Sequence, residues 1–198
     1  VFWKTGSHES CTKIIFDADK TIFSTIEYDL KRITEHLRQQ SYLTKKARIT
    51  IIDERGKDPY YYGFYFEGGL RSYIQYLVGH KKLLQENPFY VHKEVNGIEV
   101  EATFAYENNS DNREMSFANN IYTPDGGMHL TGFRSALTRT LNDYARAENY
   151  LKNSEENLTG DDVREGLVAV VSIKLREPQF EGQTKARLGN PEARTAVE

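Results

Sequence analysis

The sequence predicts an α+β fold, with a mixed or antiparallel four-stranded sheet and helices packed on one face. Two strand-like runs, 89–95 and 98–106, flank an Asn-Gly dipeptide at 96–97, which is preferred in type I′ hairpin turns. Apolar residues recur with a helical period over 129–150. The run 167–175 is nearly all apolar, which is typical of a central strand buried on both faces.

The other elements of the first half follow from similar patterns. Residues 1–16 are predicted to hold two short strands, 1–3 and 12–16, around a turn. A helix is expected over 27–41, because apolar residues there are spaced four, three and four apart: Ile26, Leu30, Ile33 and Leu37. A hairpin is expected to pair 47–52 with 60–66.

Three further elements complete the prediction. A short helix is expected after Glu67-Gly68-Gly69, where apolar residues lie three, one and three apart. The third strand of the sheet is expected over 115–122, after an acidic and Asn-rich turn. A single helical turn is expected over 159–165, ahead of the central strand.

Composition excludes several classes of protein. The 13 Tyr, 10 Phe and 1 Trp are too many for a disordered chain, and no window approaches 18 consecutive apolar residues, as a membrane span would need. Cys11 is the only cysteine, so no disulfide scaffold can form and a reducing compartment is the default. The net charge of -3 argues against a nucleic-acid-binding domain with a basic excess.

The two ends of the chain suggest a longer protein. The chain opens on three apolar residues without an initiator Met, and it stops within a predicted helix that Asn190 would cap. We therefore expect residues 1–18 to close a preceding domain and residues 19–190 to form the main domain. Residues 191–198 would begin a helix leading to the next domain.

No self-contained active site is apparent. None of the five His lies in a nucleophile motif, and neither a P-loop nor a G-x-G-x-x-G motif occurs. The densest carboxylates, Asp17 with Asp19 and Asp161 with Asp162, are more simply explained as turn or helix-start residues. We expect no metal site and no independent enzyme.

Three segments each allow a structural and a functional interpretation. Residues 125–134 can be a glycine turn before a helix, and residues 159–166 a capped helical turn that Gly166 ends. Residues 180–190 form a polar loop that is either solvated or suited to anion capture, through the Lys185 ammonium and the Gln183 amide.

These segments carry a resemblance to a known family. Glu67-Gly68-Gly69, Asn119-Asn120-Ile121 and residues 125–134, 159–167 and 178–185 occur in the family's order. Over about residues 20–198 the chain resembles the transducer domain of the ATPase subunit of bacterial type IIA DNA topoisomerases. Gyrase and topoisomerase IV share these motifs, so the choice between them stays open, with gyrase B ahead. Cys11 stands where the family has Gly.

The resemblance implies a transducer fold of the GHKL ATPase group, with a βαβ crossover. It implies that a loop reaches the γ-phosphate of ATP, with Gln183 and Lys185 in catalytic positions and Gln183, Thr184 and Lys185 in contact with the nucleotide. ATP and Mg²⁺ are then cofactors of the full-length subunit, and neither is expected to bind this fragment. Residues 1–18 would be the closing strands of the ATP-binding domain.

The resemblance also implies partners: a DNA duplex bound without sequence preference, the ATP-binding domain, a second copy of the subunit and a gyrase A-type DNA-cleaving subunit. No membrane is involved, and the protein would work in the cytoplasm at the nucleoid. Candidate DNA-binding residues are Arg139 and Arg146, seven apart on one helix face, with Arg134 at the flank. A solvated polar face explains these arginines equally well. The alternative function is a non-enzymatic DNA- or protein-binding module on the same scaffold.

Overall fold

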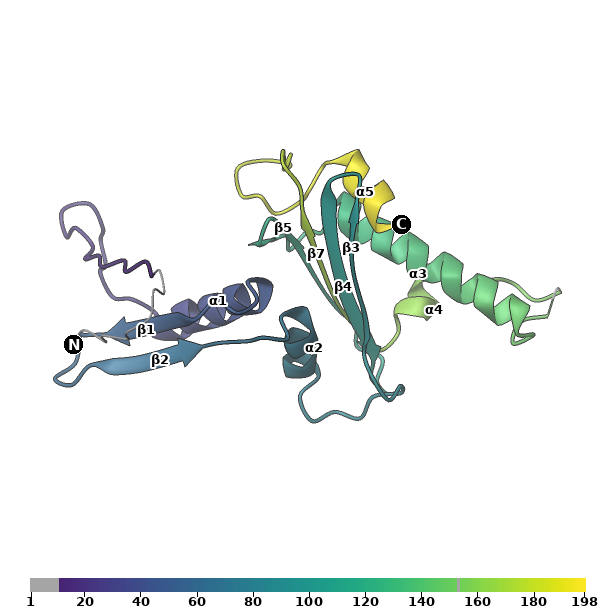
Figure 1. Cartoon of the computed structure of the whole chain (residues 1–198), viewed down its shortest axis with the longest axis horizontal. Coiled ribbons are helices and arrows are strands. Elements are labelled where there is room, and N and C mark those ends of the chain that lie inside the picture. The colour runs from purple at the N-terminus through teal and green to yellow at the C-terminus, as the bar shows by residue number, and fades with distance from the viewer. Residues whose placement is uncertain (1–10, 153) are drawn as a thin grey trace.

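A computed structural model describes residues 11–152 and 154–198 and confirms the α+β class (Figure 1). In chain order the elements are α1 (Leu30–Leu43), β1 (Ile49–Asp53), β2 (Tyr60–Phe64), α2 (Leu70–Val78), β3 (Phe89–Val95), β4 (Ile98–Tyr106), β5 (Arg113–Ala118), β6 (Ile121–Tyr122), α3 (Met128–Ala147), α4 (Gly160–Arg164), β7 (Leu167–Lys174) and α5 (Pro191–Val197).

In the described part of the chain the main sheet has five strands in the order β3-β4-β7-β5-β6, instead of the predicted four. The strand expected over 115–122 is broken because Asn119 and Asn120 both adopt positive φ, 49° and 64°, which turns the chain back on itself. β6 then pairs antiparallel with the end of β5. β5 and β7 are parallel neighbours joined through α3, so the expected βαβ crossover is present.

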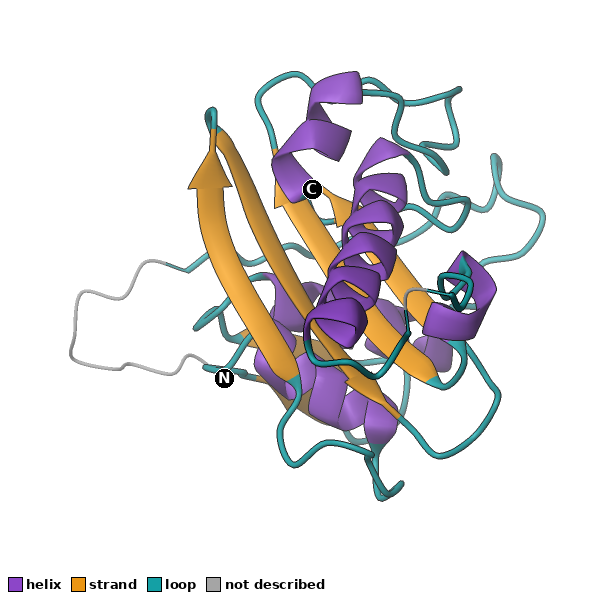
Figure 2. Cartoon of the chain, turned by 90° about the vertical axis from the view of Figure 1, so that its right-hand side faces the viewer, coloured by secondary structure: helices purple, strands orange, loops and turns teal. Residues whose placement is uncertain are grey.

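Helices cover both faces of this sheet, so the expectation of helices on one face was wrong. Leu167, Ala169 and Val171 of β7 pack towards α3, and Val168 and Val170 pack towards α2 and the end of α1. A strand that is apolar on both sides must be covered on both sides. Figure 2 shows α3 in front of the sheet and further helices behind it.

A smaller unit lies beside the sheet. Among the described residues, β1 and β2 pair only with each other, and they lie against α1 (Figure 1). Arg38 of α1 links this unit to α2, because its guanidinium donates to the hydroxyls of Tyr62 of β2 (3.1 Å) and Tyr76 of α2 (2.7 Å). α1 begins later than predicted because the Asp29 side chain accepts a hydrogen bond from the backbone N–H of Arg32 at 3.0 Å and caps the helix.

The strand predicted over 12–16 is absent from the described residues. Ile14 and Ile15 are 81% and 76% exposed, and no strand of the described chain lies beside them to complete a ladder. The strand predicted over residues 1–3 lies outside the described residues.

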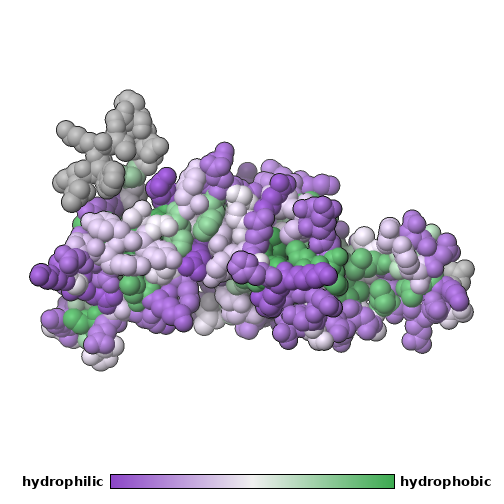
Figure 3. Space-filling view, turned by 90° about the horizontal axis from the view of Figure 1, so that it is seen from below, coloured by the Kyte–Doolittle hydropathy of each residue, from purple (hydrophilic) through white to green (hydrophobic). Residues whose placement is uncertain are grey.

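On the face that Figure 3 shows, the surface is largely hydrophilic, with small hydrophobic patches and a larger hydrophobic band that extends from the middle of the molecule towards the end carrying α3. Within residues 11–152 and 154–198, no helix combines the length and the apolar character that a membrane crossing requires.

A buried carboxylate connects the loops at one end of the sheet. Glu107 is 2% exposed, and it accepts hydrogen bonds from Lys81 Nζ (2.8 Å), Asn109 Nδ2 (2.9 Å) and Arg113 Nη2. Burial alone would raise the pKa of Glu107, but the bond from Lys81 and the charge of Arg113 outweigh it and hold the pKa below its usual value. Its backbone N–H also donates to the carbonyl of Gly166 (2.8 Å), just ahead of β7.

Candidate phosphate-contact loop and arginine groove

The polar loop after β7 folds back on itself as a narrow hairpin. Phe180 and Leu188 form an antiparallel bridge, and the Glu181 N–H donates to the Arg187 carbonyl at 2.9 Å. The Gly189 N–H donates to the Gln179 carbonyl at 2.8 Å. We call residues 179–189 the phosphate loop, after the role that the family resemblance predicts for Gln183 and Lys185. These bonds bring its two ends together.

The base of the phosphate loop is docked on the turn before α3. Leu188 is fully buried, its N–H donates to the Gly126 carbonyl (3.2 Å), and its carbonyl accepts from the Met128 N–H (2.9 Å). Gly126 and Gly127 have φ of 69° and 135°, which confirms the predicted glycine turn. A Cβ on Gly127 would lie 2.4 Å from the Leu188 carbonyl oxygen, so only glycine allows this approach.

The tip of the loop brings together the three residues that the resemblance assigned to ATP. Gln183, Thr184 and Lys185 are all exposed, and Lys185 has φ 55°, in the left-handed region. The Lys185 ammonium lies 5.9 Å from the centre of the Phe180 ring and forms no ion pair with any residue in the described part of the chain. The tip therefore presents one uncompensated positive charge and one amide to the outside.

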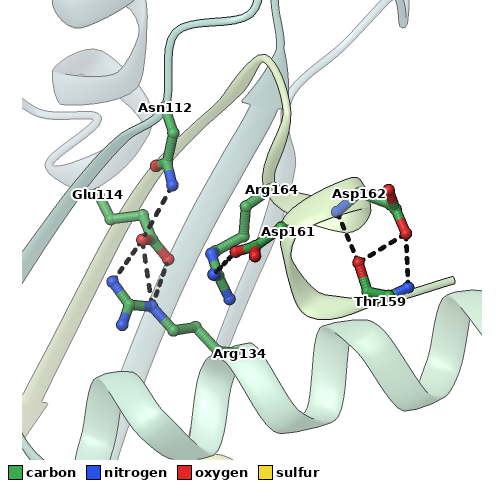
Figure 4. A network of polar contacts seen from close by, with 7 residues as sticks. All are labelled: Asn112, Glu114, Arg134, Thr159, Asp161, Asp162 and Arg164. Carbon is green, nitrogen blue, oxygen red and sulfur yellow. Dashed lines mark hydrogen bonds and ion pairs between the residues drawn. The ribbon is translucent and has the colours of Figure 1, made fainter.

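The three candidate DNA-binding arginines have different surroundings. Arg134 donates twice from Nε and once from Nη2 to the carboxylate of Glu114, at 3.0, 3.1 and 2.6 Å (Figure 4). The Glu114 side chain is only 4% exposed, and the bond to it raises the pKa of Arg134 above its ordinary value. Arg134 thus balances a buried carboxylate, which reduces its net charge towards an outside anion.

Arg146 and Arg139 differ from Arg134 in having no carboxylate partner among the residues that the structure describes. Arg146 donates to the carbonyls of Lys152 and Glu155 and to Asn157 Oδ1, which orders the loop after α3. Arg139 is exposed, and within the described chain its side chain makes no hydrogen bond or ion pair. Of the three, Arg139 is the arginine with all its donors available.

Arg139 lies in an open groove of about 530 Å³ between α3, α4 and the loop before α4. The groove is lined mainly by polar and charged residues, three of them arginines and one an aspartate: Arg134, Ser135, Thr138, Arg139, Asn142, Asp143, Asn157, Leu158 and Arg164. Arg164 was missed as a site residue because the sequence explained it as part of a capped helical turn. That turn is present, with reciprocal Thr159 and Asp162 bonds, and Arg164 pairs with Asp161 beside the groove (Figure 4).

No three His, Cys, Asp or Glu side chains of residues 11–152 and 154–198 cluster in a way that could hold a metal ion. Among the His of this part of the chain, His129 is fully buried. Its Nε2 lies 3.3 Å from Thr123 Oγ1, and Thr123 is bonded in turn to Ser116 of β5. His129 thereby connects the first turn of α3 to the sheet.

Burial lowers the pKa of His129 to about 4, from an ordinary value of 6.5. The unfolded chain therefore binds one more proton between these values, so stability is full above pH 6.5 and falls as the pH drops towards 4. We expect a loss of about 2 kcal/mol between pH 7 and pH 5. His129→Gln should flatten this slope in urea unfolding, whereas His80→Gln, at an exposed position without a polar contact in the described chain, should keep it. An unchanged slope in His129→Gln would exclude His129 as its source.

Comparison with known proteins places these features in a family. A family model described as DNA gyrase B matches residues 69–198. The DNA gyrase B protein of Clostridium acetobutylicum is 46% identical over 199 residues, covering 100% of this chain and 31% of the relative. That of Bacillus mycoides is 46% identical over 184 residues, covering 92% and 45%. The chain thus spans less than half the length of these relatives.

Solved structures show the same likeness. The 43K ATPase domain of Thermus thermophilus gyrase B, in complex with an aminocoumarin, superimposes with a TM-score of 0.75 at 39% identity, covering 90% of this chain and 48% of that one. The ATP-binding domain of Francisella tularensis topoisomerase IV, in complex with a small-molecule inhibitor, gives 0.71 at 28% identity, covering 90% and 48%. The matched family model, the similar relatives and the shared fold show that this chain belongs to the DNA gyrase B family.

Proposed function

We propose that the chain is the transducer part of an ATP-dependent type IIA DNA topoisomerase subunit of the gyrase B type. In this proposal it contacts the γ-phosphate of ATP and couples ATP hydrolysis to closure of a DNA gate and strand passage. One observation carries the proposal: the phosphate loop has an exposed tip at which Lys185 forms no ion pair within the described chain, on a base that is docked against α3.

The residues at the tip suit a phosphate group. An ammonium on a flexible stem compensates anionic oxygens as a point charge, and an amide N–H donates to one of them. Lys185 and Gln183 would supply these two groups, with Thr184 between them. The phosphate group that they would contact is the γ-phosphate of bound ATP. The described residues offer no cluster for Mg²⁺, so we assign Mg²⁺ and the other catalytic groups to the ATP-binding domain of the subunit.

The base of the loop explains how contact at the tip could reach the rest of the domain. Leu188 is bonded on both sides to the turn that begins α3. α3 in turn crosses one face of the sheet, and α5 follows directly after the loop. A displacement of Lys185 would thus also displace α3 and α5, which move as units because packed cores deform little.

The same proposal covers domain limits and partners. Residues 1–18 would be the closing strands of the ATP-binding domain, residues 19–190 the transducer, and residues 191–198 the start of a helix towards the next domain. The partners would be the ATP-binding domain, a second copy of the subunit, a gyrase A-type subunit and a DNA duplex, in the cytoplasm at the nucleoid.

Lys185→Ala tests the γ-phosphate contact in a subunit that carries the ATP-binding domain. We expect ATP hydrolysis to fall by more than about tenfold, because a charge that stabilises the transferred phosphoryl group is lost. Arg187→Ala is the matched control, because Arg187 lies in the same loop but pairs with Glu181 at 3.3 Å. It should retain turnover within about twofold. Unchanged turnover in Lys185→Ala would favour the non-enzymatic binding module.

We also propose that the groove beside Arg139 faces the DNA duplex. The overall charge of -3 does not oppose this, because a local basic surface is sufficient for weak binding to phosphates. Arg139 lines that groove and makes no hydrogen bond or ion pair within the described chain, whereas Arg164, which also lines it, is paired with Asp161. Arg134 lines it too, but its donors are largely used within the protein.

Arg139→Glu should weaken binding of a random-sequence duplex at low salt by roughly three- to tenfold, because one phosphate contact is replaced by repulsion. The control is Arg32→Glu, which makes the same charge change at an exposed position on α1. Fluorescence anisotropy over a salt series measures both variants. Equal weakening by the two variants would show that net charge alone is responsible, and the groove proposal would fail.

A further inference from the structure

We propose that Asn190 is a positioning residue for the phosphate loop, an inference that rests on the proposed function of that loop. Asn190 is 1% exposed. Its Oδ1 accepts from the backbone N–H of Gln179 at 2.6 Å, and its Nδ2 donates to the carbonyl of Glu177 at 3.1 Å. The same Nδ2 donates to Glu192 Oε1 at 2.7 Å.

These bonds make one amide hold both ends of the loop. Gln179 and Glu177 lie on the incoming side of the loop, whereas Asn190 follows it, eleven and thirteen positions along the chain. Glu192 fixes which way the amide points, since a carboxylate only accepts hydrogen bonds and must face the Nδ2 group. The bond also lowers the pKa of Glu192, so this carboxylate stays ionised and keeps its partner.

The Asn190 side chain bonds to the loop, although the position of Asn190 in the chain favours a helix cap. It is the N-cap residue of α5, and an Asn there ordinarily accepts from a backbone N–H of the first turn, worth about 1 kcal/mol. In this structure its side chain makes no such cap bond. The sequence predicted the cap position but not the diversion of the side chain to the loop. The stabilisation that a cap would give α5 is therefore forgone in favour of closing the loop.

The arrangement also fixes the loop relative to two helices. Ala193, three residues after Asn190, is fully buried. α5 lies so close to α3 that a Cβ on Gly132 would come within 2.5 Å of the Arg194 carbonyl oxygen. Because Asn190 joins the loop to α5, and Leu188 joins it to the start of α3, the tip with Lys185 has two anchors.

Hydrogen exchange of this chain, without any nucleotide, measures how firmly Asn190 holds the phosphate loop. In Asn190→Ala we expect the amides of residues 179–189 to exchange at least about tenfold faster, because the buried bond to Gln179 is lost. Asn190→Asp keeps an acceptor for Gln179 but places an oxygen against Glu177 and Glu192, so it should also accelerate exchange. Asn112→Ala, at an exposed position, is the control. Unchanged exchange in Asn190→Ala would overturn the proposal.

ATP hydrolysis by a subunit that carries the ATP-binding domain then tests positioning. We expect Asn190→Ala to lower kcat by roughly fivefold or more, with the KM for ATP changed less than about twofold. In a Lys185→Ala background it should cause no further loss, because both changes remove the same contact. A full additional loss in the double variant would overturn positioning through Lys185. Normal turnover of Lys185→Ala itself would instead overturn the proposed function, whatever the exchange result.

Discussion

Glu107→Ala should lower the free energy of unfolding by about 3 kcal/mol, because it removes the buried member of an ion-pair network and leaves its partners unpaired. Lys81 and Arg113 then lose their shared carboxylate, and Asn109 loses an acceptor. The loss in free energy of unfolding stays near the lower end of the range for broken buried ion pairs, because the Lys81 side chain is 49% exposed and its ammonium can be hydrated. Thermal unfolding of this chain should show a Tm lower by roughly 6–12 °C.

The control for this prediction is Glu86→Ala. Glu86 is another loop glutamate, between α2 and β3, whereas Glu107 follows β4. Glu86 is exposed and makes no polar contact with the rest of the described chain. Its replacement should change the free energy of unfolding by less than about 0.5 kcal/mol. A Glu107→Ala protein as stable as Glu86→Ala would show that the network contributes nothing.

Gly127→Ala is the second substitution with a large expected effect, about 3 kcal/mol, because the backbone conformation and the packing both oppose a side chain there. Gly127 has φ 135° and ψ -168°, a region that is essentially restricted to glycine and costs about 1–3 kcal/mol for other residues. The new methyl group would also meet three backbone atoms of Leu188 at 2.4, 2.5 and 2.9 Å. Backbone atoms cannot rotate away, so either the turn or the base of the phosphate loop must shift.

Gly97→Ala separates these two causes. Gly97 also has positive φ, 77°, but a Cβ there would meet nothing within 4 Å. We expect that variant to lose only about 1 kcal/mol, from backbone strain alone. Gly127→Ala should in addition accelerate hydrogen exchange at Leu188, whose N–H bonds to Gly126. Equal losses in the two variants, with unchanged exchange at Leu188, would contradict close packing of the loop base.

Much of the fold was predictable because local signals were strong. The Asn-Gly turn sets the register of β3 and β4, whose bounds match the prediction. The apolar run at β7 correctly indicated a central strand. A strand that is apolar on both sides also implies that other elements cover both faces of the sheet. The expectation of helices on one face overlooked this implication. The break at Asn119 was missed because two consecutive asparagines with positive φ are rare.

The strand predicted over 12–16 shows that a local residue pattern does not by itself determine whether a strand forms. A β-branched run favours a strand, but the strand forms only when a partner accepts its backbone hydrogen bonds. In the described chain Ile14 and Ile15 remain exposed and unpaired with any strand. A local pattern cannot show where the partner lies.

The site was predictable in part. The glycine turn follows from sequence chemistry and is present. The assignment of Gln183, Thr184 and Lys185 to the nucleotide comes from the family resemblance and stays a prediction. The pairing of Arg134 with Glu114 joins residues 20 positions apart on different elements, so helical spacing could not reveal it. The role proposed for Asn190 was hidden for a similar reason: its position predicts a cap, and only the folded chain places the Gln179 N–H beside it.

The most direct measurement of the central claim compares two nucleotides that differ by the γ-phosphate. In a subunit that carries the ATP-binding domain, isothermal calorimetry would give the affinities of Lys185→Ala and of the unchanged protein for a non-hydrolysable ATP analogue and for ADP. We expect the variant to bind the analogue about tenfold more weakly or worse, which corresponds to about 1.4 kcal/mol, and to bind ADP within about twofold of the unchanged protein. Equal affinities of both proteins for the analogue, or an equal loss for both nucleotides, would contradict a γ-phosphate contact at Lys185.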